Sequence, residues 1–294
     1  MIVCCGQHWG VVDMPQRVNE FTQVRLADGV FVTQRGPAML QFGADATRTG
    51  VVETARADRL SSLFDAPFTP RPVRYLIHQL RPIIGGDAAR SLVADLMAYR
   101  ILVPTDPAAV ALIGATPLAE ELAGVLGRSD CLLRRPETAD VGPGFLEQLS
   151  AWGPLAVVDQ PHLAEAVARY TRAGATPVVP VTSLDSRVVV GPVRLGPGDP
   201  CPACLDAYLR ERDAGWERVR DGQYAQRSTP NAAVVAAGAA AAAVVVRRLA
   251  GAPDPPGVSA PPPAPGGCVI ADPFGPQPTQ TVVLERHPDC NVCY

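Results

Sequence analysis

Two pairs of cysteines carry the clearest chemistry in this 294-residue sequence. Cys201 and Cys204 form one C-x-x-C motif, and Cys290 and Cys293 form another. Each motif presents two thiolates from one tight turn, and four thiolates suit the tetrahedral coordination that Zn²⁺ adopts in proteins. Because the motifs contain no fifth ligand, they predict a closed, structural zinc site that fastens the C-terminal tail to the preceding domain.

Two alternative roles for the cysteines stay open. A thioredoxin-like redox pair would follow a strand and open a helix, as Cys201 and Cys204 partly do, but it gives no reason for a second pair. The cysteines could also be unrelated buried thiols, and His287 could replace one of them as a ligand. Cys131 and Cys268 have apolar neighbours and are expected in the core.

The composition excludes several kinds of chemistry and partner. A net charge of −3 gives no general reason to bind nucleic acid or an anionic membrane. All 26 basic residues are arginine, which excludes a Schiff-base or P-loop lysine. The first residues lack the features of a secretory signal, so we expect a cytoplasmic protein, whose reducing surroundings favour metal ligands over disulfides. Cys4 and Cys5 are assigned no role.

One stretch, residues 231–251, is long and apolar enough to span a membrane. It is mostly alanine, which contributes little insertion energy, and no second apolar segment accompanies it. Asn231 as the N-cap, Arg247 and Arg248 in the last turn, and Gly251 after them predict a closely packed core helix instead.

Residues 1–105 have the pattern of a small α+β module. Strand-like runs with turn signals fill residues 24–55. Helical patterns follow over residues 56–66, 72–85 and 87–102. This order predicts a winged-helix-like module, and the acidic residues of the last helix leave it without the basic stripe of a DNA-binding helix.

Residues 106–294 alternate strands with helices, which is typical of a parallel sheet. The segment "ALIGATPLAEEL" has the strand, turn and helix of a dinucleotide fold, but it keeps only Gly114, and Thr116 stands where the second glycine belongs. Bound nucleotide is therefore not expected. Arg134 and Arg135 follow the next strand and could accept a 2′-phosphate, so an NADP-dependent oxidoreductase stays an alternative.

Asp159 ends the apolar run "PLAVVD", at the strand end that faces the ligand side of such a sheet. His162 follows closely, but no matching nucleophile is identifiable, and a helix start is the ordinary role for such a residue. The proline-rich stretch "GAPDPPGVSAPPPAPGG" is expected to be a mobile connector.

Several segments of the second domain resemble a known family. These are "VVDQPHLAEAVARYTRAGATPVVPVTS", "VVVGPVRLGPGDPCPACLDAYLRERDAGW", the alanine-rich helix and "RHPDCNVC". They are similar to ThiF-like, ubiquitin-activating-type proteins, in particular the divergent branch of thiazole/oxazole-modified peptide biosynthesis, called the cyclodehydratase ThiF-like subunit or precursor leader-peptide-binding protein. The resemblance covers about residues 108–294 and implies a Rossmann-like sheet domain whose two C-x-x-C pairs share a zinc ion.

The resemblance also implies that the nucleotide site is vestigial. Active relatives hold ATP with an acidic residue after the second strand, an arginine, a lysine, and an aspartate near the position of Asp159. Here Asp159 remains, Arg134 stands in the region of the acidic residue, and the sequence has no lysine. We therefore expect a remnant site at Gly114 and Asp159, no bound ATP, no catalytic residue, and no enzymatic activity of the chain on its own.

In that branch the N-terminal module takes the leader of a ribosomal precursor peptide as an extra strand between its third strand and third helix. The matching positions are Val51, Val52, Glu53, Thr54, Arg90 and Asp95. The resemblance implies a scaffold that delivers the precursor to a YcaO-type cyclodehydratase, and a homodimer. The alternatives are an adenylating enzyme that activates the C-terminus of a carrier protein, and a stand-alone regulatory or structural protein.

Overall fold

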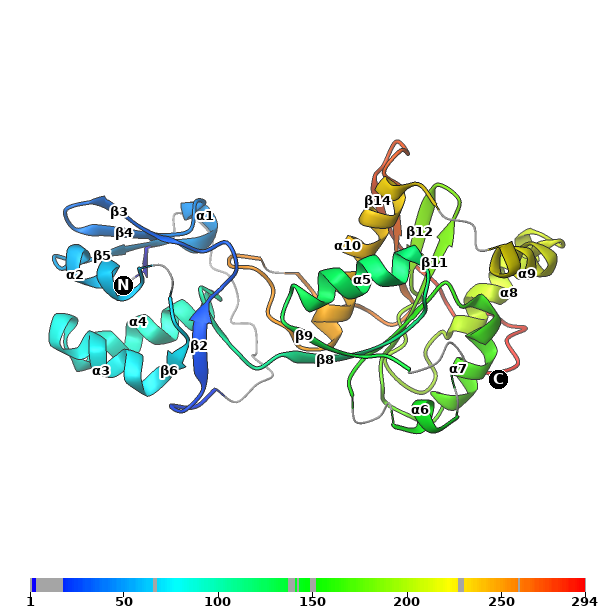
Figure 1. Ribbon diagram of the computed structural model, residues 1–294, viewed down its shortest axis with the longest axis horizontal. Coiled ribbons are helices and arrows are strands. Elements are labelled where there is room, and N and C mark those ends of the chain that lie inside the picture. Colours follow the sequence, from blue (N-terminus) through cyan, green and yellow to red (C-terminus); the bar gives the residue numbers. More distant parts are fainter. Residues whose placement is uncertain are drawn as a thin grey trace. The chain divides into compact units, whose positions relative to one another are not determined.

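The computed structural model describes residues 2–3, 18–65, 68–136, 141, 143–148, 152–226, 230–258 and 260–293. The chain forms two compact units (Figure 1). The first contains residues 1–106 together with 253–261, and the second contains residues 107–252 together with 262–294. Cys4 and Cys5 lie outside the described residues.

An antiparallel sheet forms one layer of the first unit. Its strands, in spatial order, are β1 (Ile2–Val3), β5 (Val51–Glu53), β4 (Met39–Phe42) and β3 (Val32–Gly36). In β4, Leu40 and Phe42 are buried and Met39 is exposed, as expected of a strand with one face on a core. The short helix α1 (Ala46–Thr49), capped by Asp45, precedes β5.

Three helices complete the core of the first unit: α2 (Ala57–Leu63), α3 (Val73–Ile84) and α4 (Gly86–Ala98). Their buried side chains join those of β4 and β5 in one apolar cluster. Within it the rings of Phe42 and Phe64 meet edge to face, with centroids 5.3 Å apart. A second small sheet contains β6 (Arg71–Pro72), β2 (Gln23–Leu26) and β7 (Leu102–Pro104).

Part of the proline-rich stretch packs onto this first unit. Gly257 has a φ of +67°, and a Cβ atom there would lie 2.4 Å from the carbonyl oxygen of Arg48, so only glycine fits. The Arg100 guanidinium donates a hydrogen bond to the carbonyl oxygen of Val258 at 2.7 Å and lies 3.7 Å from the Asp254 carboxylate. This part of the stretch, expected to be a mobile connector, is thus held by specific contacts.

A seven-stranded mixed sheet forms the centre of the second unit. Its strands, in spatial order, are β14 (Thr279–Val283), β13 (Gly267–Ala271), β12 (Arg187–Val190), β11 (Val178–Leu184), β10 (Leu155–Val158), β8 (Ala108–Ile113) and β9 (Cys131–Arg134). The pairs from β11 to β9 are parallel, and those from β11 to β14 are antiparallel. The predicted α/β architecture is confirmed, and only part of the sheet is parallel.

Helices cover both faces of this sheet. On one face, α5 (Pro117–Gly127) and α10 (Ala232–Leu249) pack in one cluster with alternate residues of β8, β10, β11 and β12. On the other face, α6 (Pro143–Gln148) and α7 (Ala164–Tyr170) cover the intervening residues of β8 and β10. Burial on both faces explains why the parallel strands are continuous apolar runs.

The alanine-rich helix α10 is a core helix. Asn231 caps it, Arg247 and Arg248 lie in its last turn, and eight of its residues are buried. A Cβ atom at Gly238 would lie 2.4 Å from Val188 Cγ2, so the small residues bring the helix close to β12. Among the described residues α10 alone is long and apolar enough to cross a bilayer, and its packing agrees with the predicted core helix.

Candidate functional site

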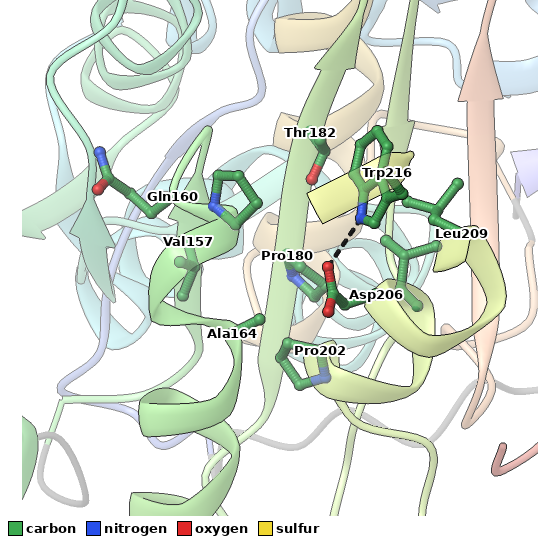
Figure 2. A pocket seen from close by; sticks show the side chains of 11 residues that line it. Val157, Gln160, Ala164, Pro180, Thr182, Pro202, Asp206, Leu209 and Trp216 are labelled. Carbon is green, nitrogen blue, oxygen red and sulfur yellow. Dashed lines mark hydrogen bonds between the residues drawn. The ribbon is translucent and has the colours of Figure 1, made fainter. Parts of the chain in front are cut away.

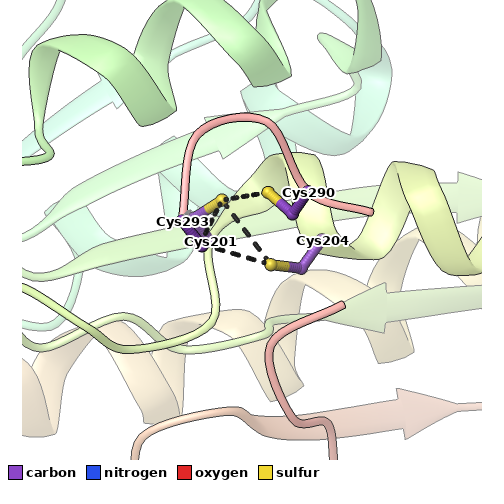
Figure 3. A group of neighbouring side chains, drawn as sticks. All are labelled: Cys201, Cys204, Cys290 and Cys293. Atoms are coloured by element: carbon purple, nitrogen blue, oxygen red, sulfur yellow. Dashed lines mark hydrogen bonds between the residues drawn. The ribbon is translucent and has the colours of Figure 1, made fainter. Parts of the chain in front are cut away.

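The four paired cysteines converge in the second unit. Their sulfur atoms lie within 4.8 Å of one another (Figure 3). The Sγ atom of Cys201 is 3.8 Å from that of Cys204, 3.7 Å from that of Cys290 and 3.4 Å from that of Cys293. Four sulfurs at about 2.3 Å from a central Zn²⁺ ion would be separated by about 3.8 Å. The cluster therefore fits a tetrahedral metal ion.

Local structure prepares this arrangement. Cys201 is the N-cap of α8 (Pro202–Arg212), with Pro202 at the first helical position, and Cys204 lies in the first turn. The positive end of the helix dipole favours thiolates at both positions. Cys290 and Cys293 come from a turn near the end of the sequence, where the Cys290 amide donates to the carbonyl oxygen of His287 at 3.0 Å.

His287 supports the second cysteine turn and is not one of the converging groups. It is 4% exposed, and its Nδ1 accepts a hydrogen bond from the Asp289 amide at 3.1 Å. Its Nε2 lies 3.3 Å from the Glu211 carboxylate on α8, and its ring meets that of Tyr208 edge to face. Both ring nitrogens are thus engaged, and the ring fixes the turn against α8.

The thiols perturb one another strongly. The hydrogen bond with Cys204, together with burial, raises the pKa of Cys201, and the same hydrogen bond lowers the pKa of Cys204 to about 4. Burial raises the pKa of Cys293 to about 12. Three of these cysteines are buried and Cys293 is half-buried. Four thiolates this close repel one another unless a cation lies between them, so the donor set suits a divalent metal ion.

The same geometry argues against a redox pair. Each sulfur of the first motif lies as close to a sulfur of the second motif as to its own partner: Cys204 is 3.5 Å from Cys293 and 3.8 Å from Cys201. A C-x-x-C redox centre works through its own two sulfurs and does not require contacts with a second pair. The other two described cysteines, Cys131 and Cys268, are buried free thiols, as predicted.

The two positions predicted for a remnant nucleotide site, Gly114 and Asp159, follow the carboxyl ends of the parallel strands β8 and β10. Gly114 follows β8, and a Cβ atom there would lie 2.6 Å from the carbonyl oxygen of Val158, so glycine is needed for packing. Thr116 caps α5 and also donates its hydroxyl to Asp159 Oδ2 at 2.8 Å. Asp159 Oδ1 accepts the amide and hydroxyl of Ser183 at 2.7 and 2.8 Å. The aspartate thus ties three strand ends together.

Of the two adjacent arginines, Arg134 and Arg135, the second contacts that glycine turn. Arg135 donates to the carbonyl oxygen of Gly114 at 2.8 Å and to both carboxylate oxygens of Glu120, at 2.5 and 2.9 Å. That hydrogen bond lowers the pKa of Glu120. The Arg134 guanidinium lies over the ring of Trp152, 5.0 Å from its centroid. No sequence pattern indicates that Ser183 on β11 binds Asp159 or that Glu120 on α5 binds Arg135.

A mostly apolar pocket lies between the first turns of α7 and α8 (Figure 2). Its walls include Val157, Gln160, Ala164, Pro180, Thr182, Pro202, Leu205, Leu209 and Trp216. Asp206 accepts a hydrogen bond from Trp216 Nε1 at 2.8 Å and lies 3.2 Å from Arg210 and 3.3 Å from Arg220. His162 lies in the short 3-10 helix beside it, and burial lowers its pKa. The polar lining of this pocket comes from Gln160, Thr182 and Asp206, and sequence patterns did not predict the pocket.

In the first unit, β5 contains three of the residues predicted for peptide binding, and Thr54 follows it. Val52 is buried, Val51 is half-buried and Glu53 is exposed. Thr54 donates its amide to Ala38 on the β4 side at 2.8 Å. Because amides alternate along a strand, Val51 and Glu53 direct theirs to the opposite side. There Ile2 and Val3 lie antiparallel to β5.

The two α4 residues predicted for peptide binding differ in exposure. Arg90 is exposed and forms an ion pair with Asp87 on its own helix, while Asp95 is half-buried. Nothing in this arrangement distinguishes a peptide contact from an ordinary solvated helix face. Their assignment remains a prediction.

No protein-family model matches the chain, and no curated protein matches it. Among solved structures, a heterocyclase in complex with substrate and cofactor is similar, with a TM-score of 0.57 at 14% identity over 92% of this chain and 39% of that chain. The heterocyclase TruD has a TM-score of 0.55 at 14% identity, over 92% of this chain and 43% of its own. The chain thus shares the fold of these heterocyclases and spans about two-fifths of their length, which agrees with the resemblance noted in the sequence.

Proposed function

We propose that this protein is a non-catalytic scaffold that binds the leader of a ribosomal precursor peptide and delivers it to a YcaO-type cyclodehydratase for azoline formation. The observation that carries the proposal is the fold shared with two heterocyclases over 92% of the chain. Those proteins are more than twice as long as the part that corresponds to this chain. We propose that the ATP-dependent chemistry comes from outside these 294 residues.

The first unit supplies the proposed peptide site. An extended peptide can add to β5 because the amides of Val51 and Glu53 face away from β4. Main-chain hydrogen bonds would provide affinity, and contacts with α4 would provide specificity. The winged-helix character of the unit, and the roles of Arg90 and Asp95, belong to this proposal.

The second unit supports a scaffold role better than an adenylating one. At the glycine turn, Asp159 and the Gly114 carbonyl already accept hydrogen bonds from Thr116, Ser183 and Arg135. Pro117 also removes one amide donor from the start of α5. An ATP phosphate needs free donors at such a turn. The four cysteines would hold a structural zinc ion, which would contribute folding energy and bind the end of the sequence to α8.

A fluorescence-polarisation titration tests the peptide role. The probe is a labelled leader of a precursor peptide encoded beside the gene for this protein, added to the full chain. We expect saturable binding that Glu53→Pro weakens at least tenfold, because proline removes an amide from the row that faces the peptide. Glu53→Thr, which keeps the amide, is the matched control. No binding to the unaltered chain would contradict the proposal.

The rival adenylating function has its own assay. ATP–pyrophosphate exchange that depends on a carrier protein with a diglycine tail would overturn the scaffold role. Co-purification with a YcaO-type subunit would support it, and size-exclusion chromatography with light scattering would show whether the protein is the expected homodimer.

A further inference from the structure

One of the two amides proposed for the peptide, that of Val51, already faces another strand of the chain. Ile2 lies opposite Val52, and Val3 lies opposite Val51, in antiparallel register. In an antiparallel ladder, two directly opposed residues whose amides face one another exchange both hydrogen bonds. Because the Val51 amide faces away from β4, Val3 and Val51 form such a pair.

The two edges of this sheet differ in their suitability for pairing. The β3 edge has a register irregularity between Gln34 and Gly36, with Arg35 between them, and such features discourage pairing with another strand. The β5 edge is regular and begins with two valines. A regular edge of this kind accepts an added strand, and Ile2–Val3 has the uncharged, β-branched composition that pairs with it.

We infer that Ile2–Val3 is an internal ligand of the β5 edge, which a partner peptide must displace before it can bind. That Ile2–Val3 occupies the β5 edge rests on the strand pairing alone. That the displacing partner is a leader peptide rests on the proposed function. A tethered segment has a high effective concentration, so it lowers the apparent affinity of a competing peptide by the fraction of time that the edge is free. A two-residue strand is short enough to be displaced by a longer peptide that adds in the same antiparallel direction.

Amide hydrogen exchange, resolved by residue in the full chain, tests the occupancy. In Val3→Pro the ring removes the amide that faces Val51, so exchange at Val51 should become at least fivefold faster. Exchange at Val52 and Thr54, whose amides face β4, should stay unchanged and shows that the sheet remains folded. Val3→Thr, which keeps the amide and the β-branch, should behave like the unaltered protein. An unchanged exchange rate at Val51 in Val3→Pro would overturn the inference.

Peptide titration with the same three proteins tests the competition. The labelled leader should bind Val3→Pro several-fold more tightly than it binds the unaltered chain or Val3→Thr. Equal affinity for all three would show that Ile2–Val3 does not compete, and the inference would fail although the proposed function stands. If no leader binds any of them, the proposed function and the competition fail together, and the exchange rate at Val51 still decides whether the edge is occupied.

Discussion

The cysteine cluster and the glycine turn both lie in the second unit, and both match motifs that bind ligands in other proteins. At the cluster, four sulfurs face one another across a space that suits one metal ion. At the turn, Asp159 and the carbonyl of Gly114 accept hydrogen bonds from side chains of the chain itself. A motif therefore indicates a binding site where its donor atoms converge on one common space, and not where each is hydrogen-bonded to another part of the fold.

Cys290→Ser tests the cluster and should have the largest effect. Loss of one thiolate should abolish stoichiometric zinc binding and lower the free energy of unfolding by about 3 kcal/mol or more, because metal binding is coupled to folding. Elemental analysis and chemical denaturation measure the two quantities. Cys131→Ala, at a buried thiol outside the cluster, should keep the zinc and cost about 1 kcal/mol. Retention of zinc by Cys290→Ser would contradict the four-cysteine site.

Gly114→Ala tests whether the glycine turn serves packing. A Cβ atom would lie 2.6 Å from the Val158 carbonyl oxygen, and the φ of +139° is strained for any side chain. We expect a loss of about 2–4 kcal/mol in the free energy of unfolding. Gly127→Ala in α5, where nothing lies within 4 Å, should be neutral or slightly stabilising. If the two variants were equally stable, packing would not explain the glycine at position 114. The close approach of a phosphate group would then be the remaining reason for it.

Asp159→Ala tests whether the aspartate after β10 serves the fold. The carboxylate accepts three hydrogen bonds, from Ser183 and Thr116, so its removal should cost about 2–3 kcal/mol in thermal or chemical unfolding. Ser183→Ala removes one of these bonds and should cost less. If Asp159 were kept only to bind nucleotide, its loss would leave the stability of the free protein unchanged.

Glu120→Gln should have the smallest effect. Arg135 lowers the pKa of Glu120 in the folded state, so the ion pair stabilises the fold above the unfolded pKa of about 4.3 and loses this contribution as the pH falls through the folded pKa. Because Glu120 is 59% exposed, we expect at most a few tenths of a kcal/mol at pH 7. Denaturation curves at pH 7 and pH 3 should show the difference shrinking at the lower pH.

Much of the fold could be predicted because local patterns are strong. Alternating strands and helices identified the α/β unit, and caps with an apolar, alanine-rich interior identified α10 as a core helix. The antiparallel part of the sheet was harder to predict, because β12, β13 and β14 are short and one of them pairs with residues about eighty positions earlier. Hydrophobic periodicity does not report strand direction.

From the sequence alone we could predict which four cysteines converge, because two C-x-x-C pairs suit one tetrahedral metal ion. Which polar groups are already bonded within the fold could be seen only from the three-dimensional contacts. Arg135, Ser183 and Ile2–Val3 come from segments distant in the sequence from the groups they bind. The physical reason is that residue type and local spacing fix what an atom can bind, whereas contacts between distant segments fix whether it is already bound.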